Sequence, residues 1–290
     1  MANFFIIGGS GAYYLGKGAL GIEAEAIEAK TPFGPAGPIH ILDLKGQRIG
    51  FLSRHGERGY TLTAPFINYR ANIWAAKELG AERILTWTGP GAINPKFRPG
   101  DYVVPSDILD FTKSRPLTFF ENTGLGFIRQ NPVFCPVLRL SFLRAAKKSS
   151  SRIHDGGTYA CTEGPRLETP AEVRFLKKAG ADMVGMTLVP EVFLARELEM
   201  CYASICYITN YAEGVKALPY RKGELFEGAL PSKEKAKVDA ALASLPEIIA
   251  QTIIDLAEKE RRCPCKDAML RYKIKGDIGK DWRRWSETKS

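Results

Sequence analysis

Short apolar runs bounded by Gly or Pro alternate along the chain with longer amphipathic stretches, and this alternation limits the fold more than any other feature. The apolar runs predict strands at Asn3–Gly8, Ile39–Leu44, Arg48–Ser53, Arg83–Thr88, Asp101–Val104, Thr158–Cys161, Met183–Met186 and Tyr202–Ile208. The stretches between them predict helices at Phe66–Leu79, Val137–Lys148, Thr169–Ala179, Val189–Glu199 and Lys233–Arg262. This order of elements indicates an α/β fold in which helices wrap a β-sheet core.

The helix expected over Thr169–Ala179 has a well-defined start. Thr169 is a favourable N-cap, Pro170 suits the first helical position, and Glu172 stands where a capping box needs an acidic side chain. We therefore expect this helix to begin directly after Thr169.

Charge is spread unevenly along the chain. The net charge of the chain is +9. The last 32 residues, from residue 259 onwards, contain eleven Lys and Arg and five Asp and Glu, so they carry +6 of this charge. We expect one domain over 1–262 and a basic C-terminal extension over 263–290, either a docked helix or a flexible arm. Because the surplus lies in the extension, it says little about the substrate of the domain.

Composition excludes several classes of protein. Apolar residues make up 45% of the chain and charged residues 25%, which are ordinary globular values and exclude a disordered chain. No apolar run approaches the roughly 20 residues of a membrane span. The first residues lack the basic region and the small-residue cleavage site of a signal peptide. We therefore expect a cytoplasmic protein that does not bind membranes.

Six cysteines in a chain of 290 residues do not form a secreted disulfide framework. Cys263 and Cys265 form a C-P-C segment that is tighter than the usual C-x-x-C zinc pair, and no histidine lies nearby, so we expect no metal. Three Gln and seven Asn are few, as in thermophile proteins. Intracellular disulfides occur in some thermophiles, and the C-P-C segment could take part in one.

Small or polar residues follow four of the expected strands at once, in the segments Gly8–Gly11, Ser53–Gly56, Thr88–Gly91 and Gly185–Thr187. Strand ends are where α/β sheets usually bind ligands. Glycine N–H groups, the Ser10 and Thr187 hydroxyls and the Arg54 guanidinium are suited to holding a phosphate. Each segment alone is commonly a turn, so the prediction depends on their joint occurrence. Neither a P-loop nor a G-x-G-x-x-G motif stands among them.

Two further segments carry polar groups at turns. Glu163 and Glu168 flank a sharp turn before the helix that Thr169 caps, and Asn210 follows the Tyr202–Ile208 strand. Taken alone, Glu168 could serve as a capping residue and Asn210 as a turn residue.

Eight segments occur together in a recognisable order: GGSG (Gly8–Gly11), TPFG (Thr31–Gly34), RHG (Arg54–Gly56), NYRANIWA (Asn68–Ala75), PGD (Pro99–Asp101), TEGPRLET (Thr162–Thr169), GMTLVPE (Gly185–Glu191) and CYASICYITNYAEG (Cys201–Gly214). On these segments the chain resembles the purine nucleoside phosphorylase superfamily, and within it the methylthioadenosine/methylthioinosine phosphorylase branch. The resemblance covers about residues 3–258. It implies a single-domain phosphorylase/hydrolase-like α/β fold, with a central mixed sheet that forms a distorted barrel flanked by helices.

The resemblance also implies an activity and a set of site residues. Members cleave the glycosidic bond of a purine nucleoside with inorganic phosphate as co-substrate, use no metal or organic cofactor, and assemble as homotrimers or hexamers. Carried over to this chain, the phosphate-binding residues are Ser10, Arg54, His55, Thr88, Gly89 and Thr187. Ribose and base would contact Met186, Leu167 and Tyr60. Glu168 and Asn210 would face the polar edge of the base and act in catalysis.

Base preference follows from donors and acceptors. A 6-oxopurine presents an N1–H donor and an O6 acceptor, whereas adenine presents the reverse. Glu168 can accept from N1–H, while Asn210 can donate to O6 and meet a proton at N7 with its oxygen. Adenine-preferring members of the branch typically have Asp at the position of Asn210 and a small hydroxyl residue at that of Glu168. We therefore expect methylthioinosine, inosine or guanosine as substrate.

Two departures from the family pattern bear on the sugar and on phosphate. Members often carry histidines after RHG and near the FCP segment (Phe134–Pro136), and this chain has none at either place. The sequence therefore does not decide whether the sugar of the substrate carries a 5′-methylthio or a 5′-hydroxyl group. Pro90 in the loop after Thr88 cannot donate a backbone N–H.

Three alternatives stay open. The chain could be a methylthioadenosine phosphorylase that releases adenine, or a hydrolytic nucleosidase, which Ser10, Arg54 and Thr187 disfavour. From another class, it could be a purine-binding regulator or an RNA-binding protein acting through its extension, in which Trp282 and Trp285 lie among basic residues. Because such runs are usually solvated surface, we do not expect nucleic acid as a partner.

Overall fold

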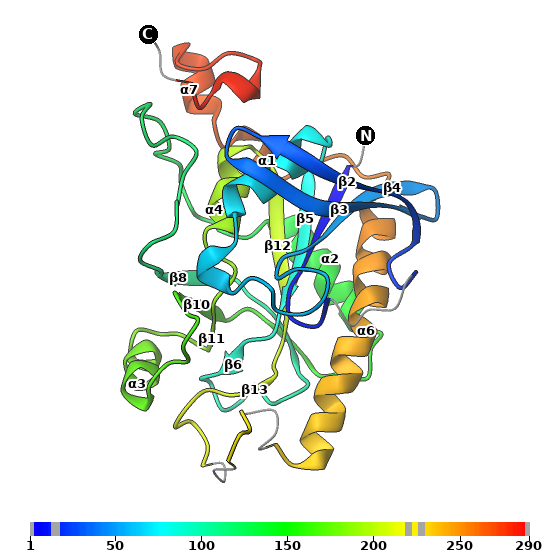
Figure 1. The fold of residues 1–290 in the computed structure, drawn as a ribbon, viewed down its shortest axis with the longest axis vertical. Helices are drawn as coiled ribbons and strands as arrows, with labels where there is room; N and C mark the ends of the chain where they lie inside the picture. The colour runs from blue at the N-terminus through cyan, green and yellow to red at the C-terminus, as the bar shows by residue number, and fades with distance from the viewer. Residues whose placement is uncertain (1–2, 13–17, 218–221, 226–229, 288–290) are drawn as a thin grey trace.

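The computed structural model describes residues 3–12, 18–217, 222–225 and 230–287 and shows two β-sheets with helices around them (Figure 1). The larger sheet has the order β2-β3-β4-β1-β5-β12-β7-β9. Its strands are β1 (Phe4–Gly8), β2 (Ile22–Thr31), β3 (Gly34–Leu44), β4 (Gln47–Ser53), β5 (Arg83–Thr88), β7 (Tyr102–Val104), β9 (Ile153–Asp155) and β12 (Cys201–Tyr207). The smaller sheet has the order β13-β6-β11-β10-β8 and consists of β6 (Gly91–Ala92), β8 (Asp107–Phe111), β10 (Thr158–Thr162), β11 (Met183–Gly185) and β13 (Asn210–Tyr211).

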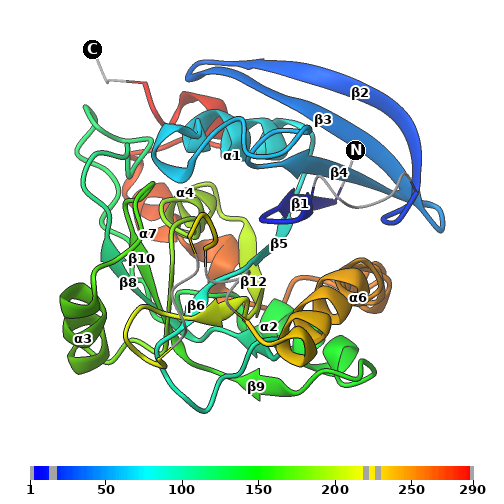
Figure 2. The ribbon, with the colours of Figure 1, turned by 60° about the horizontal axis from the view of Figure 1, so that its bottom comes forward.

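Helices cover both faces of the larger sheet (Figure 2). The α-helices are α1 (Tyr69–Glu78), α2 (Pro136–Ala146), α3 (Pro170–Lys178), α4 (Glu191–Glu197), α6 (Ser232–Leu256) and α7 (Leu270–Lys275), and short 3-10 turns are η2 (Ala64–Phe66), η3 (Pro264–Asp267) and η4 (Trp282–Arg284). Helices α1 and α4 contact each other, whereas α2 and α6 pack together on the opposite side of β12. The fold is the mixed α/β arrangement that the resemblance implies.

Four neighbouring strands at the centre of the larger sheet run in the same direction. β1 is parallel to β4 and to β5, and β12 is parallel to β5. All residues of β1, β5 and β12 are buried, as expected for parallel strands covered on both faces. Their carboxyl ends therefore meet at one edge of the sheet, where the polar segments follow.

All eight expected strands and all five expected helices are present. The structure differs from expectation in having further strands and in the end of one helix. β2 was not expected because its Glu-rich face is exposed and carries little apolar signal. β6 and β13 are too short to show a period. The last long helix ends at Leu256, before the predicted Arg262. α3 starts as predicted, since Thr169 and Glu172 form both halves of a capping box.

The C-terminal extension packs on the body of the protein. Its Cys263, Cys265, Met269 and Trp285 are buried, and the Trp282 ring lies 4.7 Å from that of Trp74 in α1. Its residues therefore belong to the core as well as to the surface. In the part of the chain that the structure describes, no helix is both long and apolar enough to cross a membrane.

Candidate active site

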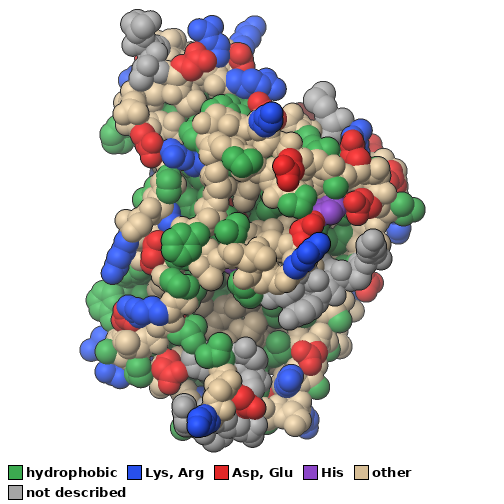
Figure 3. Space-filling model, in the orientation of Figure 1, with side chains coloured by type: hydrophobic (Ala, Val, Ile, Leu, Met, Phe, Trp, Pro, Cys, Tyr) green, Lys and Arg blue, Asp and Glu red, His purple; other side chains and the backbone are tan. Residues whose placement is uncertain are grey.

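The segments predicted to hold phosphate follow strands that end side by side. Gly8 at the end of β1 pairs with Ser53 at the end of β4, and Thr88 at the end of β5 pairs with Cys206 of β12. The parallel register thus brings GGSG, RHG and the loop after Thr88 to one edge, as strand direction requires. In the orientation of Figure 1, the surface shows a hollow below its centre with hydrophobic side chains around it (Figure 3).

Glycine at position 9 lets the GGSG loop approach β5. A Cβ atom on Gly9 would lie 2.1 Å from the Trp87 carbonyl oxygen and 3.0 Å from Arg54 Nη1, so a larger residue cannot be accommodated. The Ser10 carbonyl oxygen accepts hydrogen bonds from Trp87 Nε1 at 3.2 Å and from the Tyr207 hydroxyl at 3.1 Å. The Ser10 hydroxyl in turn meets the Tyr60 hydroxyl. This loop is therefore fixed against the sheet at the predicted anion site.

Arg54 forms a buried ion pair that the sequence analysis did not predict. Its Nε lies 2.6 Å from Glu191 Oε1 and its Nη2 lies 2.7 Å from Oε2, a bidentate pair with both side chains inaccessible to solvent. Nη2 also donates to Thr86 Oγ1 at 2.6 Å. Only Nη1, with a long 3.4 Å contact to the Trp87 carbonyl, faces the Gly9 backbone. One side of the guanidinium is thus held by the protein and the other is directed toward the loop.

His55 is buried next to this pair and is held as a neutral imidazole. Its Nδ1 lies 2.9 Å from the Leu62 carbonyl oxygen, so Nδ1 carries the hydrogen and Nε2 carries a lone pair. Burial, followed by the positive charge of Arg54, lowers the pKa of His55 to about 4. Among the residues described, Nε2 has no hydrogen-bond partner. The Tyr60 ring packs on the imidazole at 4.4 Å between centroids, which links RHG to Ser10.

Thr88 and Thr187 come together from the two sheets. Their hydroxyl oxygens lie 3.1 Å apart, and both residues are buried. Thr88 ends β5 of the larger sheet, and Thr187 follows β11 of the smaller one. A Cβ atom on Gly89 would lie 2.6 Å from the Thr209 side chain, so this loop is also tightly packed. The geometry brings together two hydroxyl donors that are 99 residues apart in sequence.

Glu168 lines a cavity of about 390 Å³ beside α3. Its Oε1 accepts a 2.5 Å hydrogen bond from Thr162 Oγ1, which also lies 3.3 Å from the Gly185 carbonyl oxygen, two residues before Thr187. The cavity is lined by Phe111, Lys113, Thr162, Glu163, Gly164, Arg166, Glu168, Glu172, Phe175 and Leu176. Of the predicted site residues, only Glu168 is among them, so this cavity does not contain the residues predicted to hold phosphate.

Of the predicted ribose- and base-contacting residues, Met186 is half-buried and the other two are exposed. Met186 Sδ lies 2.5 Å from the place that a Cβ on Gly164 would occupy, so Met186 packs on the TEGPR turn. Leu167 is 41% exposed and Tyr60 is 54% exposed, so both can contact a ligand that enters from the surface.

Asn210 lies on the smaller sheet next to the loop that follows Thr88. β13 pairs with β6, and a Cβ atom on Gly91 would lie 3.2 Å from Asn210 Nδ2. The Asn210 amide donates to the Tyr211 carbonyl at 2.8 Å and accepts from Thr209 Oγ1 at 2.6 Å. Gly89–Gly91 therefore connects Asn210 with Thr88. The side chain forms hydrogen bonds to its chain neighbours and none with Glu168 among the residues described.

Comparison with known proteins shows the family of this chain. The family model described as the phosphorylase superfamily matches residues 3–245. The chain belongs to this superfamily. A probable 6-oxopurine nucleoside phosphorylase of Thermococcus kodakarensis is 42% identical over 93% of this chain and 98% of its own length. A probable S-methyl-5′-thioinosine phosphorylase of Methanothermobacter thermautotrophicus is also 42% identical, over 91% of this chain and 88% of its own.

The fold of the superfamily is shared over nearly the whole chain. The crystal structure of a methylthioadenosine phosphorylase from an antarctic soil metagenomic library superposes with a TM-score of 0.83 at 27% identity, and the match covers 98% of both chains. It therefore includes the C-terminal extension that the sequence resemblance left out.

Arg115 positions the site and was missed by the sequence analysis. It is buried and donates through Nη1 to the Met186 and Val189 carbonyls at 2.6 Å each, and through Nη2 to the Glu163 carbonyl at 2.6 Å. One guanidinium thus connects the TEGPR turn with the GMTLVPE segment. Its local sequence, KSRPL, carries no signal of this role. Only the fold shows which carbonyls surround it.

Proposed function

We propose that this protein cleaves purine nucleosides with inorganic phosphate, with a preference for 6-oxopurines, and releases the free base and a sugar 1-phosphate. The observation that carries the proposal is the convergence of Gly9, Arg54, Thr88 and Thr187 at one edge of the sheet. Backbone N–H groups, a guanidinium and paired hydroxyls together form an oxyanion site. The relatives named as 6-oxopurine nucleoside and thioinosine phosphorylases support the same chemistry.

A bound phosphate would account for the buried Thr88 and Thr187 hydroxyls and for His55 Nε2, which has no hydrogen-bond partner among the described residues. As the glycosidic bond breaks, positive charge develops on the sugar, and a phosphate dianion beneath it stabilises that charge. At neutral pH the dianion keeps one P–OH group, which can donate to the lone pair on His55 Nε2. The remaining oxygens accept from Thr88, Thr187 and Arg54 Nη1. The protein therefore acts by positioning and electrostatics, and needs no covalent nucleophile.

Base preference depends on Glu168 and Asn210. A Glu168 carboxylate released from Thr162 can accept the N1–H of a 6-oxopurine, and the Asn210 amide can donate to O6 while its oxygen meets N7–H. Each buried polar mismatch with adenine costs about 1–3 kcal/mol, so two mismatches favour hypoxanthine or guanine about 10²-fold or more. Both side chains form protein hydrogen bonds in the structure, so substrate binding requires each to exchange partners.

The second candidate is a methylthioadenosine phosphorylase, which the likeness to the soil-metagenome enzyme favours. Methylthioadenosine, methylthioinosine and inosine should be assayed side by side, each with and without phosphate. The proposal predicts the highest kcat/KM for one of the two 6-oxopurine nucleosides. A preference for methylthioadenosine would replace it by the second candidate.

An RNA-binding role finds less support. The Trp282 ring packs on Trp74 and lies beside Lys77 at 6.0 Å, and the Trp285 side chain is buried with its Nε1 donating to the Gly279 carbonyl. Aromatic rings used in packing are not available to stack on bases.

We also propose a homotrimer or hexamer, a cytoplasmic location, and a reaction that uses phosphate without an organic cofactor. Sedimentation equilibrium of the full chain would test the assembly. A monomer at micromolar concentration would contradict it.

A further inference from the structure

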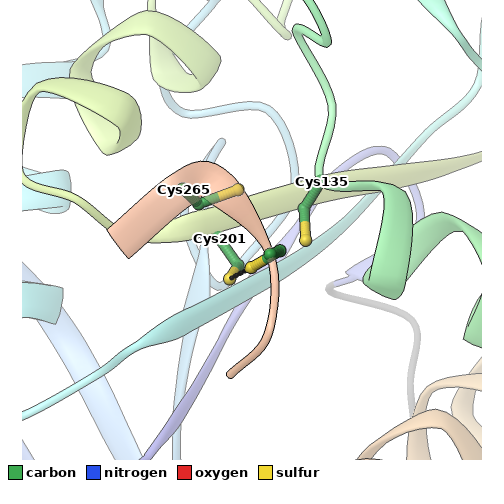
Figure 4. Close-up of side chains that lie close together, drawn as sticks. Cys135, Cys201 and Cys265 are labelled. Atoms are coloured by element: carbon green, nitrogen blue, oxygen red, sulfur yellow. Dashed lines mark hydrogen bonds between the residues drawn. The ribbon is translucent and has the colours of Figure 1, made fainter. Parts of the chain in front are cut away.

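Four cysteines from three distant parts of the chain meet at the start of β12, and Figure 4 labels Cys135, Cys201 and Cys265 among them. Cys135 is the residue before α2, Cys201 begins β12, and Cys263 and Cys265 belong to the C-terminal extension at η3. All four are at most 4% exposed. The spacing of the C-P-C segment, taken alone, predicted no metal. The fold adds two sulfur atoms to that segment.

The sulfur atoms have the arrangement of a closed metal site. All four Sγ atoms lie within 4.8 Å of one another. Cys201 Sγ and Cys263 Sγ are 3.2 Å apart, well beyond the about 2.05 Å of a disulfide bond. Tetrahedral zinc with Zn–S bonds of about 2.3 Å places its sulfurs about 3.8 Å apart. The Cys201–Cys263 pair would therefore widen by about 0.6 Å around a central ion, and any pair near the 4.8 Å limit would close by about 1 Å.

We propose that Cys135, Cys201, Cys263 and Cys265 bind one structural Zn²⁺ ion that fixes the C-terminal extension to the core. Four sulfur ligands and no open position are typical of structural zinc. On binding, the four thiols release four protons and the site takes a net charge of −2, with no change in oxidation state.

Groups around the cluster suit a negatively charged site. The Arg261 guanidinium interacts with Cys201, and its side chain is only 11% exposed. Among the described residues, the buried Arg261 Nε has no hydrogen-bond partner, so a donor remains available. Such donors to thiolate sulfur stabilise metal–sulfur centres.

The site would join three elements that otherwise make separate contacts. The extension is also held at Glu199, which accepts from the Met269 N–H at 3.0 Å and pairs with Lys273. A zinc ion would add covalent links from the extension to β12 and to the start of α2. Its expected effect is on stability rather than on turnover, because none of the four cysteines is among the proposed substrate-binding residues.

Metal content of the full chain tests this proposal without reference to activity. The protein should be produced with zinc in the medium, purified with a reductant that does not chelate metals, and analysed by elemental mass spectrometry. We expect about one zinc ion per chain. Replacement by Co²⁺ should give the intense visible absorption of tetrahedral cobalt thiolate.

Cysteine variants test whether these four residues hold the zinc ion. The double variant C263S/C265S should lower zinc content about tenfold or more and lower the melting temperature. Cys206→Ser is a matched control, because Cys206 is a buried cysteine of the same strand as Cys201 and lies outside the cluster. It should keep its zinc.

Two results would overturn the proposal, and both are read on the wild-type chain. One is an intact mass and thiol titration that show two disulfides among the four cysteines with no metal. The other is four free thiols that take up neither zinc nor cobalt.

Discussion

The Arg54 guanidinium and the Glu191 carboxylate form a bidentate ion pair with N–O distances of 2.6 and 2.7 Å. The pair is buried. The Tyr202 hydroxyl donates to the same carboxylate at 2.6 Å. Glu191 thereby fixes two of the three guanidinium nitrogens. This pair determines the direction in which Nη1 points and links the GMTLVPE segment to RHG.

Breaking this pair should be costly. In Glu191→Gln the Arg54 charge stays buried without a counter-charge, and removal of one partner from a buried pair typically costs about 3–5 kcal/mol. Denaturant unfolding measures the loss. Glu25→Gln is the matched control, because Glu25 pairs with Arg48 at the surface and exposed pairs contribute about 0–1 kcal/mol. Equal losses in the two variants would contradict the role given to Glu191.

Stability should depend on pH through His55. Its pKa is about 4 in the folded protein and about 6.5 in the unfolded chain, so the unfolded chain binds more protons between these values. The free energy of unfolding should therefore fall as pH drops from about 6.5 to 4, by on the order of 3 kcal/mol from this residue. Unfolding curves of wild type and His55→Asn across this range measure the difference. An unchanged slope in the variant would rule out His55 as its source.

The Thr88 and Thr187 hydroxyls should contribute to the binding of phosphate. Thr187→Val keeps the shape of the side chain and removes its hydroxyl, so the KM for phosphate should rise about tenfold, while Thr187→Ser should stay within a few-fold of wild type. Initial rates at varied phosphate and saturating nucleoside measure this. If Thr187→Val changed only the KM for the nucleoside, the hydroxyl would belong to another subsite.

Asn210 should set the preference for the base. In Asn210→Asp, a carboxyl replaces the amide that we propose donates to O6, so the ratio of kcat/KM for inosine to that for adenosine should fall about 10²-fold. Competition between the two nucleosides in one reaction measures the ratio directly. Asn94→Asp provides a comparison at another amide, which donates to Asp182 at 2.8 Å. A ratio that Asn210→Asp leaves unchanged would remove Asn210 from base recognition.

The strands that build the site could be predicted because their apolar runs end abruptly in Gly and hydroxyl residues, as at Gly8 and Thr88. The start of α3 was equally clear, since Thr169 and Glu172 are local signals. Residues whose role depends on distant partners could not be predicted. Arg115 and Glu191 look like ordinary charged residues until the fold surrounds them with carbonyls or with Arg54.

The cysteine cluster also could not be predicted, because its members are distant in sequence. The spacing of Cys263 and Cys265 alone argued against metal. Cys135 and Cys201, more than 60 residues earlier in the chain, join them only after β12 and α2 have formed. Sequence spacing describes a metal site only when its ligands are local.

The central claim, that this edge of the sheet holds an inorganic phosphate that attacks the sugar, is tested most directly by the fate of the ribose. Inosine should be incubated with the enzyme with and without phosphate, and the sugar product followed by phosphorus NMR and by a reducing-sugar assay. We predict stoichiometric ribose 1-phosphate and hypoxanthine with phosphate, and no cleavage without it. Free ribose formed at the same rate in the absence of phosphate would contradict the account.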